Sequence, residues 1–299
     1  MNTDYMLEKR LNKEAPELSA RVRDCTYVLT RMLDHYLRRF PSFTDHSLLH
    51  SLTVLESCNQ IIGREQVKKL GTLECYVLIM SCYLHDIGMG ISEGELEKYS
   101  KEIDFGDYFM NHPRDNEAQA VRDFHNELSG VFINKFADFL EIPSPELTQA
   151  ISRVARGHRK TDLFDDEKYG IIKTQGQILR INYLSAVLRL ADEIDVASDR
   201  NPELLFDTSN ITDERSILAF GTHESISRVD VTAYEIVLIV DYKSSEYVEP
   251  VEKLKDKIQA TLDYCREVAE KKSDLTIWQK TVRIKKAGAQ TRDMNFSGK

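Results

Sequence analysis

The feature that most constrains this chain is the wide, even spacing of four histidines and one aspartate along helix-like sequence. Neighbouring members of the set lie 35, 40, 33 and 34 positions apart, roughly the length of one helical hairpin. In a helical bundle, ligands supplied once per hairpin by facing helices all point at one interior position. The set consists of His50, His85, His125, His158 and Asp192.

Apolar periodicity places two of these histidines on buried helix faces. His125 follows Val121 by four positions and precedes Leu128 by three, so all three share one stripe of a helix. His158 continues the stripe of Val154 in the same way. A single inward histidine is usually only a hydrogen-bonded core residue. Several on different helices favour a common site.

Asp192 strengthens this interpretation, because it continues the apolar stripe of Leu184 and Leu188. An unpaired buried carboxylate is costly, so Asp192 requires a cation. That cation is either a metal ion or the side chain of Arg189, three positions earlier. Asp195 shares the same face one turn later, and we expect it to support the site from behind the ligands.

The pair His85-Asp86 lies in the segment Leu84-His85-Asp86-Ile87-Gly88, where a predicted helix ends. An imidazole and a carboxylate exposed together at a helix end both bind one cation readily, and this donor pair suits a divalent first-row metal. The spacing and the donor types therefore predict a metal site.

The chain is predicted to be mainly α-helical, because its 13 glycines and 7 prolines are few for 299 residues. We expect a helical domain over residues 1–200, an α/β subdomain over 201–290 and a loose tail over 291–299. Periodicity, caps and breakers predict helices at 18–40, 45–62, 72–86, 115–140, 144–158, 177–196 and 251–270. Alternating or clustered apolar residues predict strands at 216–220, 228–233, 236–241 and 281–285.

Composition indicates which binding partners and which cellular compartment suit the protein. A net charge of −9 argues mildly against a long nucleic-acid track, because phosphate binding relies on clusters of lysine and arginine. Five cysteines without a C-x-x-C pair are typical of reduced thiols. The first residues lack a signal-peptide pattern, and the most apolar stretch, 76–84, is too short to span a bilayer. We therefore expect a cytoplasmic protein that does not bind membranes.

Three segments of the chain resemble the signatures of the HD-domain metal-dependent phosphohydrolase superfamily. They are FTDHSLLHS at 43–51, LHDIG at 84–88 and LRLAD at 188–192. The resemblance covers about residues 20–200 and implies an HD-type helical bundle followed by the α/β subdomain. The first segment and the strand-rich tail also resemble HD domains that accompany Hsp90-like ATPase modules in bacterial conflict systems. This implies an additional domain or partner protein, joined through the α/β subdomain.

The resemblance also implies roles for individual residues. His50, His85, Asp86 and Asp192 would be the core metal ligands. His125 and His158 match the two further histidines of members that hold two metals, with Asp86 bridging. His46, one turn before His50, would donate a proton to a leaving group or contact a phosphate. Cations close in sequence to the ligands would bind substrate phosphate, although each is as readily a solvated surface charge. They are Arg114, Arg122, Arg159 and Lys160.

Such a site predicts hydrolysis of a phosphoester in a nucleotide or oligonucleotide by water that one or two divalent ions activate, with Asp86 as a catalytic ligand. Imidazole-rich ligation favours Mn, Fe, Co, Ni or Zn, and Mg also fits. Two alternatives stay open, a single-strand nuclease and a non-catalytic module that senses nucleotides. A purely structural helical domain is the least favoured interpretation, because the ligand set is complete.

Overall fold

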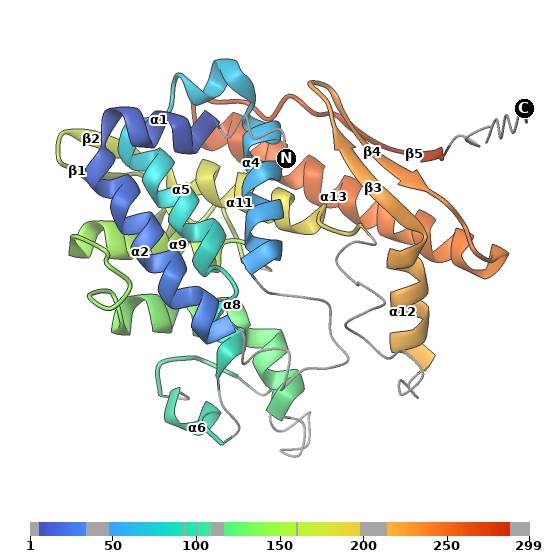
Figure 1. The fold of residues 1–299 in the computed structure, drawn as a ribbon, viewed down its shortest axis with the longest axis horizontal. Helices are drawn as coiled ribbons and strands as arrows, with labels where there is room; N and C mark the ends of the chain where they lie inside the picture. Colours follow the sequence, from blue (N-terminus) through green and yellow to red (C-terminus); the bar gives the residue numbers. More distant parts are fainter. Residues whose placement is uncertain are drawn as a thin grey trace, which may run out of the picture.

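The computed structural model describes residues 6–33, 48–91, 94–99, 101–106, 108, 117–159, 161–197 and 214–287. The fold is mainly helical, with two small sheets, as the composition predicts (Figure 1). The helices of the bundle are α1 (Met6–Glu14), α2 (Pro16–Leu33), α4 (Leu48–Val67), α5 (Thr72–Leu84), α6 (Leu96–Tyr99), α8 (Glu117–Lys135), α9 (Pro145–Arg156), α10 (Asp166–Tyr169) and α11 (Ile181–Glu193), with the 3-10 helix η1 (Ile87–Gly90).

Helix α5 lies at the centre of the bundle because it is apolar on every side. All but two of its residues are buried, and it packs against α1, α2, α4, α9 and α11. A helix that is hydrophobic all round has no solvent face and must be enclosed by others. The end of α5 therefore carries His85 and Asp86 into the interior of the protein.

Several helix ends follow local signals in the sequence. The Ser144 hydroxyl accepts a hydrogen bond from the Leu147 N–H at 3.3 Å and caps α9, with Pro145 in its first turn. Gly63, where a helix end was predicted, has non-helical angles (φ 70°, ψ 161°) and breaks α4 before its last turn. The predicted starts at residues 45 and 115 and the predicted end at residue 40 lie outside the described residues.

Two predicted elements were wrong. Residues 177–179, predicted to begin a helix, form β2 (Gln177–Leu179), which pairs with β1 (Ile172–Thr174) in an antiparallel hairpin. The turn residues Gln175 and Gly176 both have positive φ, 49° and 72°, as a two-residue type I′ turn requires. Residues 216–220, predicted as a strand, belong to helix α12 (Glu214–Glu224).

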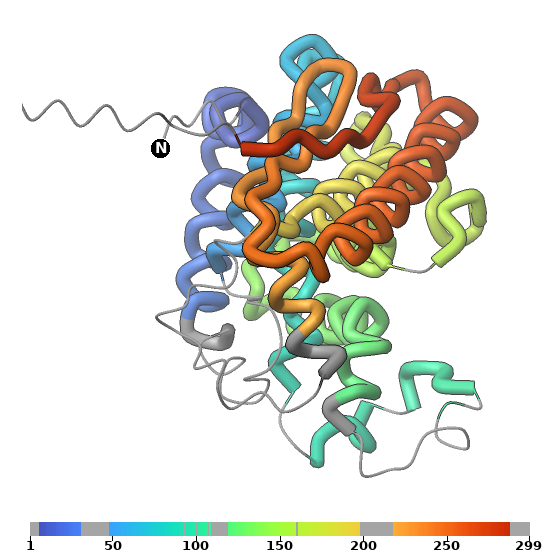
Figure 2. Tube along the Cα trace, turned by 90° about the vertical axis from the view of Figure 1, so that its right-hand side faces the viewer, coloured from blue at the N-terminus to red at the C-terminus, as the bar shows by residue number. Residues whose placement is uncertain are grey.

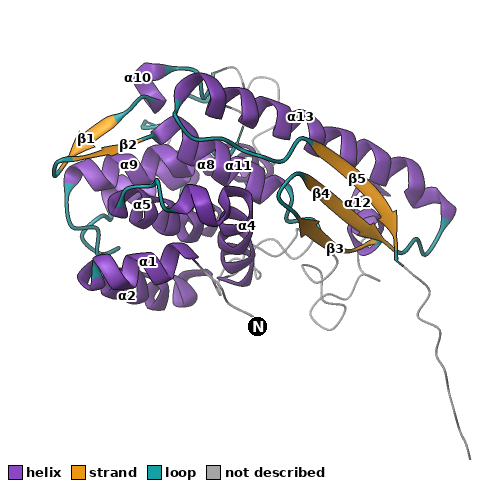
Figure 3. Cartoon of the chain, turned by 90° about the horizontal axis from the view of Figure 1, so that it is seen from above, coloured by secondary structure: helices purple, strands orange, loops and turns teal. Residues whose placement is uncertain are grey.

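The chain after α12 forms a three-stranded sheet, in the order β3-β4-β5, and one long helix. Strand β4 pairs antiparallel with β3 and parallel with β5, and α13 makes the crossover between β4 and β5. Figure 2 shows these segments together on one side of the bundle, and Figure 3 shows α13 running from the sheet along the bundle. The elements are β3 (Ile226–Val231), β4 (Glu235–Val240), η5 (Ser245–Tyr247), α13 (Val248–Lys272) and β5 (Thr281–Lys286).

An ionic network that runs from the buried Glu74 to the exposed Asp274 ties the segment after α13 to the bundle. Arg180 at the start of α11 contacts Glu74 of α5 through Nη1 and Oε2 at 2.6 Å, and Asp274 through Nε and Oδ1 at 2.6 Å. Glu74 is fully buried and also accepts hydrogen bonds from the backbone N–H groups of Gly71 and Arg180, at 2.7 and 2.8 Å. The buried carboxylate is thus fully paired, as its burial demands.

The predicted domain boundary near residue 200 and the predicted tail at 291–299 lie outside the described residues, so both stay predictions. Helix α13 packs closely along α11, and β3 contacts α4, so the region after residue 214 and the bundle are in direct contact. Among the described helices, none is both long and apolar enough to cross a lipid bilayer.

Candidate metal centre

Six side chains that the sequence singles out converge in the bundle from five places in the fold. His50 lies in the first turn of α4, and His85 and Asp86 lie between α5 and η1. The other three come from α8, from the turn after α9 and from the last turn of α11. They are His125, His158 and Asp192.

The side chains form two groups whose candidate ligand atoms lie within 4.8 Å of one another. The first group is His50, His85 and Asp192, and the second is Asp86, His125 and His158. We call these group 1 and group 2. Each offers the nitrogen and oxygen donors that suit one divalent first-row metal.

Asp86 lies between the two groups. Its Oδ2 is 3.4 Å from the Nε2 atoms of both His50 and His85. Its Oδ1 is 3.1 Å from Nε2 of His125 and 3.6 Å from Nε2 of His158. One oxygen thus faces each group, which is the arrangement of a carboxylate that bridges two ions.

The four imidazoles all turn the same ring atom towards the centre. The Nε2 atoms of His50 and His85 are 3.1 Å apart, and those of His125 and His158 are 2.8 Å apart. Two unprotonated nitrogens repel each other at such distances, because their lone pairs face one another. Each pair therefore calls for a cation or a shared proton between its rings.

The partner of Nδ1 determines the tautomer of an imidazole ring. Three Nδ1 atoms face backbone carbonyl oxygens: Cys82 at 2.9 Å from His85, Arg122 at 2.6 Å from His125 and Ala155 at 2.6 Å from His158. A carbonyl only accepts, so Nδ1 carries the hydrogen and leaves Nε2 free to bind a metal. The donor set therefore fits metal ions.

Two aspartates of α11 and the turn after it differ in position, as predicted. Asp192 Oδ1 is 3.3 Å from Nε2 of His50 and 3.7 Å from Nε2 of His85, so it faces the centre. Asp195 Oδ2 is 2.5 Å from Nδ1 of His50 and lies behind that ring. A carboxylate in that position orients a ligating imidazole and raises its basicity.

Arg189, the other cation considered for Asp192, is engaged elsewhere. Its guanidinium donates hydrogen bonds to the carbonyl oxygens of Gly157 and Thr161, each at 2.8 Å, and stacks over the ring of Tyr264. It therefore holds the turn that carries His158. A metal ion is the remaining partner of the two that the sequence indicated for Asp192.

The surroundings shift the pKa values of the residues in the centre in different directions. Burial lowers the pKa of His158 well below its usual value, and the nearby rings of His85 and His125 lower it further. Burial acts in the same direction on His85, but the carboxylates of Asp86 and Asp192 outweigh it and raise the pKa well above normal. Burial alone would raise the pKa of Asp192, yet His50 and His85 hold it well below its usual range.

Gly88 allows the two groups to meet. A Cβ at this position would lie 2.5 Å from the carbonyl oxygen of His125 and 2.6 Å from the backbone nitrogen of Ser129, so no side chain fits. The Gly88 N–H also donates to the Ser129 hydroxyl at 2.9 Å. The glycine of the LHDIG segment thus brings Asp86 up against α8.

The predicted phosphate-binding cations are only partly described. Arg159 lies at the edge of the centre, where its Nη1 donates to the Arg122 carbonyl at 3.1 Å and is 3.3 Å from Nδ1 of His125. Arg122 itself is exposed, and its carbonyl supports His125. His46, Arg114 and Lys160 lie outside the described residues, so their roles stay predictions.

One contact beside the centre has no signal in the sequence. Lys257 of α13 pairs with Glu193 of α11 at 2.7 Å, directly after Asp192. Burial raises the pKa of Glu193, while the positive charges of Lys257 and Arg159 counteract that rise. Lysines are frequent along α13, and only the packing of α13 on α11 distinguishes this one.

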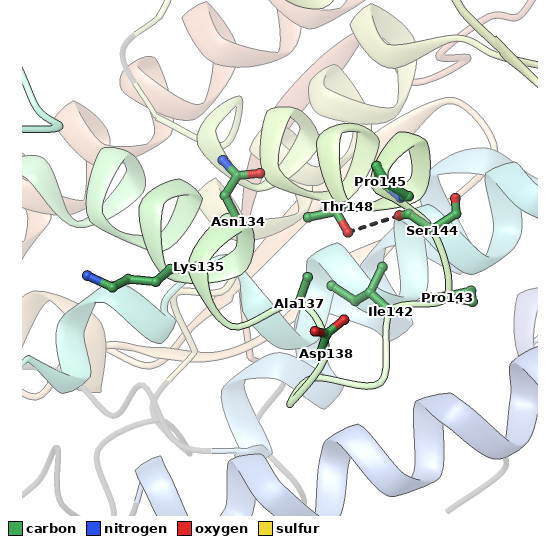
Figure 4. Close-up of a pocket in the computed structure, with 9 residues that line it drawn as sticks. All are labelled: Asn134, Lys135, Ala137, Asp138, Ile142, Pro143, Ser144, Pro145 and Thr148. Atoms are coloured by element: carbon green, nitrogen blue, oxygen red, sulfur yellow. Dashed lines mark hydrogen bonds between the residues drawn. The ribbon is translucent and has the colours of Figure 1, made fainter.

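A hollow elsewhere on the surface contains none of these residues. It lies where α8 leads into α9, and Figure 4 shows Lys135, Asp138 and Thr148 around it, with the Thr148 hydroxyl donating to the Ser144 carbonyl at 3.0 Å. Its lining comes from the end of α8, the turn that follows it and the first turn of α9.

Comparison with known families agrees with this geometry. A family model described as HD-CE matches residues 40–273, which is well over half of the chain. The chain belongs to the HD-CE family. The HD-CE match spans all six converging residues and also α12, the first two strands of the sheet and α13. No curated protein and no solved structure matches the chain.

Proposed function

We propose that this HD-CE protein hydrolyses a phosphoester bond in a nucleotide or oligonucleotide with one or two divalent metal ions. The observation that carries the proposal is the pair of histidine–aspartate groups that share Asp86, with one of its oxygens towards each group. Two ions about 3.5–4 Å apart are a recurrent device for displacement at phosphorus.

The metals, when bound, would supply Lewis acidity and a hydroxide-like nucleophile near neutral pH. The protein itself would position the ligands and the substrate. Asp86 sets the spacing of the two groups, and the acceptors behind each Nδ1 hold the rings in position before substrate arrives. Arg159 at the edge of the centre offers a guanidinium for the phosphate oxygens. Four imidazoles favour Mn, Fe, Co, Ni or Zn, with Mg also accommodated.

The test is to load the purified protein with each of these metals and to assay a panel of phosphoesters. The panel contains bis(p-nitrophenyl) phosphate, nucleoside triphosphates, cyclic and linear oligonucleotides, and single-stranded RNA and DNA. We expect metal-dependent product release that the double variant His85→Ala/Asp86→Ala abolishes. No release from any compound by the metal-loaded wild type would refute the proposal. Activity on long single strands alone would favour a nuclease, and tight nucleotide binding without turnover a sensing module.

We further propose a cytoplasmic location and a link to an Hsp90-like ATPase module or another partner through the strands and α13. The support for the location is that all five cysteines are free thiols. The support for the partner is the resemblance of residues 43–51 and of the strand-rich region to conflict-system HD domains. Co-purification of a tagged chain from its host, followed by mass spectrometry, tests the partner.

A further inference from the structure

The metal centre opens on one side among the described residues. Asp192 has a side chain that is 25% exposed, whereas the other five converging side chains are at most 6% exposed. Solvent therefore contacts the centre at Asp192, at the C-terminal end of α11, and we take this end as the opening for a substrate.

Two cations from different elements lie near this opening. Lys257 of α13 lies 2.7 Å from Glu193, the residue after Asp192, and its side chain is 66% exposed. Arg159, which follows His158 in the chain, has its Nη1 3.3 Å from the outer nitrogen of His125. Two positive charges and the carboxylate of Glu193 thus lie beside the metal centre.

We propose that Lys257 and Arg159 form a second anion subsite beside the metal centre, which binds the phosphate adjacent to the scissile one. The substrate class is then a compound with at least two neighbouring phosphates, such as a nucleoside polyphosphate or an oligonucleotide. This inference rests on the proposed function, because it takes the metal centre as the place of the scissile phosphate.

The ion pair with Glu193 keeps Lys257 in position when no substrate is bound. Without substrate, Glu193 neutralises the lysine and holds it at the opening. The lysine is largely exposed, so water weakens its attraction to Glu193 and the ammonium can exchange the carboxylate for a phosphate. The lysine ammonium has three donors on a flexible stem and follows the incoming phosphate. Metal ions held by the six converging residues would neutralise the scissile phosphate, so the outer cations are left for its neighbour.

The chain supplies a matched control on the same helix. Lys253 lies about one turn before Lys257, is 74% exposed and pairs with Glu249 at 2.7 Å. It has the same charge, a similar exposure and an ion pair of the same length, but its partner is an exposed glutamate in the first turn of α13, not a residue beside Asp192.

The experiment measures the binding of inorganic tripolyphosphate and of orthophosphate to the full chain by calorimetry, in buffer with excess Mn and with metal content checked afterwards. We expect the wild type to bind tripolyphosphate more tightly, and Lys257→Ala to reduce the ratio of the two affinities about tenfold. Lys253→Ala should leave the ratio at the wild-type value. An equal ratio in Lys257→Ala and wild type, or no preference in the wild type, overturns the subsite.

A second variant tests the direction of the effect. Glu193→Gln removes the competing carboxylate, so the affinity for tripolyphosphate should rise about threefold, and the double variant Glu193→Gln/Lys257→Ala should lose that gain. Binding needs no turnover, so the two proposals fail separately. A preference for tripolyphosphate without hydrolysis of any compound refutes only the proposed function, whereas hydrolysis with an unchanged ratio in Lys257→Ala refutes only the subsite.

Discussion

Group 1 and group 2 of the candidate centre share Asp86 but differ in how much negative charge surrounds them. Group 1 has Asp192 among its donors and Asp195 behind His50, whereas group 2 has backbone carbonyls behind both of its histidines. A formal charge binds a divalent cation more strongly than a carbonyl dipole does. The two positions are therefore not equivalent: group 1 should hold its ion tightly, and group 2 should exchange its ion.

The largest effect should come from the residue that both groups share. Asp86→Asn removes a negative charge from each group at once, so we expect loss of both ions and at least a thousandfold loss of turnover. Elemental analysis and the phosphoester assay check this. Asp123→Asn, a change to an exposed carboxylate of α8, is the control and should keep both. Retention of a full equivalent by Asp86→Asn would mean that one group binds without the bridge.

Separate removal of the two ions tests most directly whether group 1 and group 2 bind metal independently. His125→Ala or His158→Ala should release about one equivalent of metal and leave the group 1 ion in place, because His50, His85 and Asp192 remain intact. Titration with Mn followed by electron paramagnetic resonance distinguishes the sites. If either change releases both ions, the groups are coupled and our ranking of them is wrong.

The carboxylate behind His50 should account for part of the advantage of group 1. Asp195→Asn removes the charge that faces Nδ1 of His50, and we expect metal affinity at group 1 to fall about 10–100-fold, as for other residues behind a ligand. Asp192→Asn should cost more, since Asp192 faces the centre itself. The reverse ranking would assign the ligand role to Asp195.

A lower pH should weaken metal binding more strongly at group 1 than at group 2. A proton on His85 competes with a metal ion, and the raised pKa of His85 makes this competition begin at a higher pH than at His158, whose pKa is lowered. Metal affinity therefore rises with pH, by up to about tenfold per unit for each proton displaced. Mn titrations from pH 5.5 to 8.5 should show a steeper slope in His125→Ala, which keeps group 1, than in His50→Ala, which keeps group 2. Equal slopes would contradict this.

The smallest effect should follow from a change in backbone spacing. Gly88→Ala places a methyl group against the backbone of α8, so we expect about 1–3 kcal/mol lower stability and weaker binding at group 2 first. Gly90→Ala in the same turn meets nothing within 4 Å and is the control. Thermal melts with and without Mn measure both. A normal melting temperature for Gly88→Ala would mean that α8 shifts freely.

Much of the bundle was predictable because its signals are local and periodic. The apolar stripes of His125 and His158 have a helical period, and both residues are indeed buried at the centre. The cap at Ser144 and the long helix α13 also follow from short-range pattern. The convergence of six residues was predicted from the stripes together with the family resemblance. Their roles as ligands stay predictions until metal is measured.

The errors fall where tertiary contacts decide the structure. The β1–β2 hairpin was missed because Gln177 looks helical locally, yet its side chain accepts a hydrogen bond from the Leu73 N–H at 3.2 Å on α5. In α12 a short apolar run fits strand or helix equally well. The pair of Lys257 and Glu193 depends on how α13 lies on α11, which no local pattern contains.

The ionic network around Arg180 has a consequence for how the chain can be divided. The HD-CE match ends at residue 273, one position before Asp274, which pairs with Arg180. A fragment cut at that end would keep every converging side chain of the metal centre, but it would leave Arg180 with Glu74 alone and remove β5 from the sheet. A fragment intended for crystallisation or binding studies should therefore extend through residue 286, because the boundary of family resemblance and the boundary of stable folding differ here.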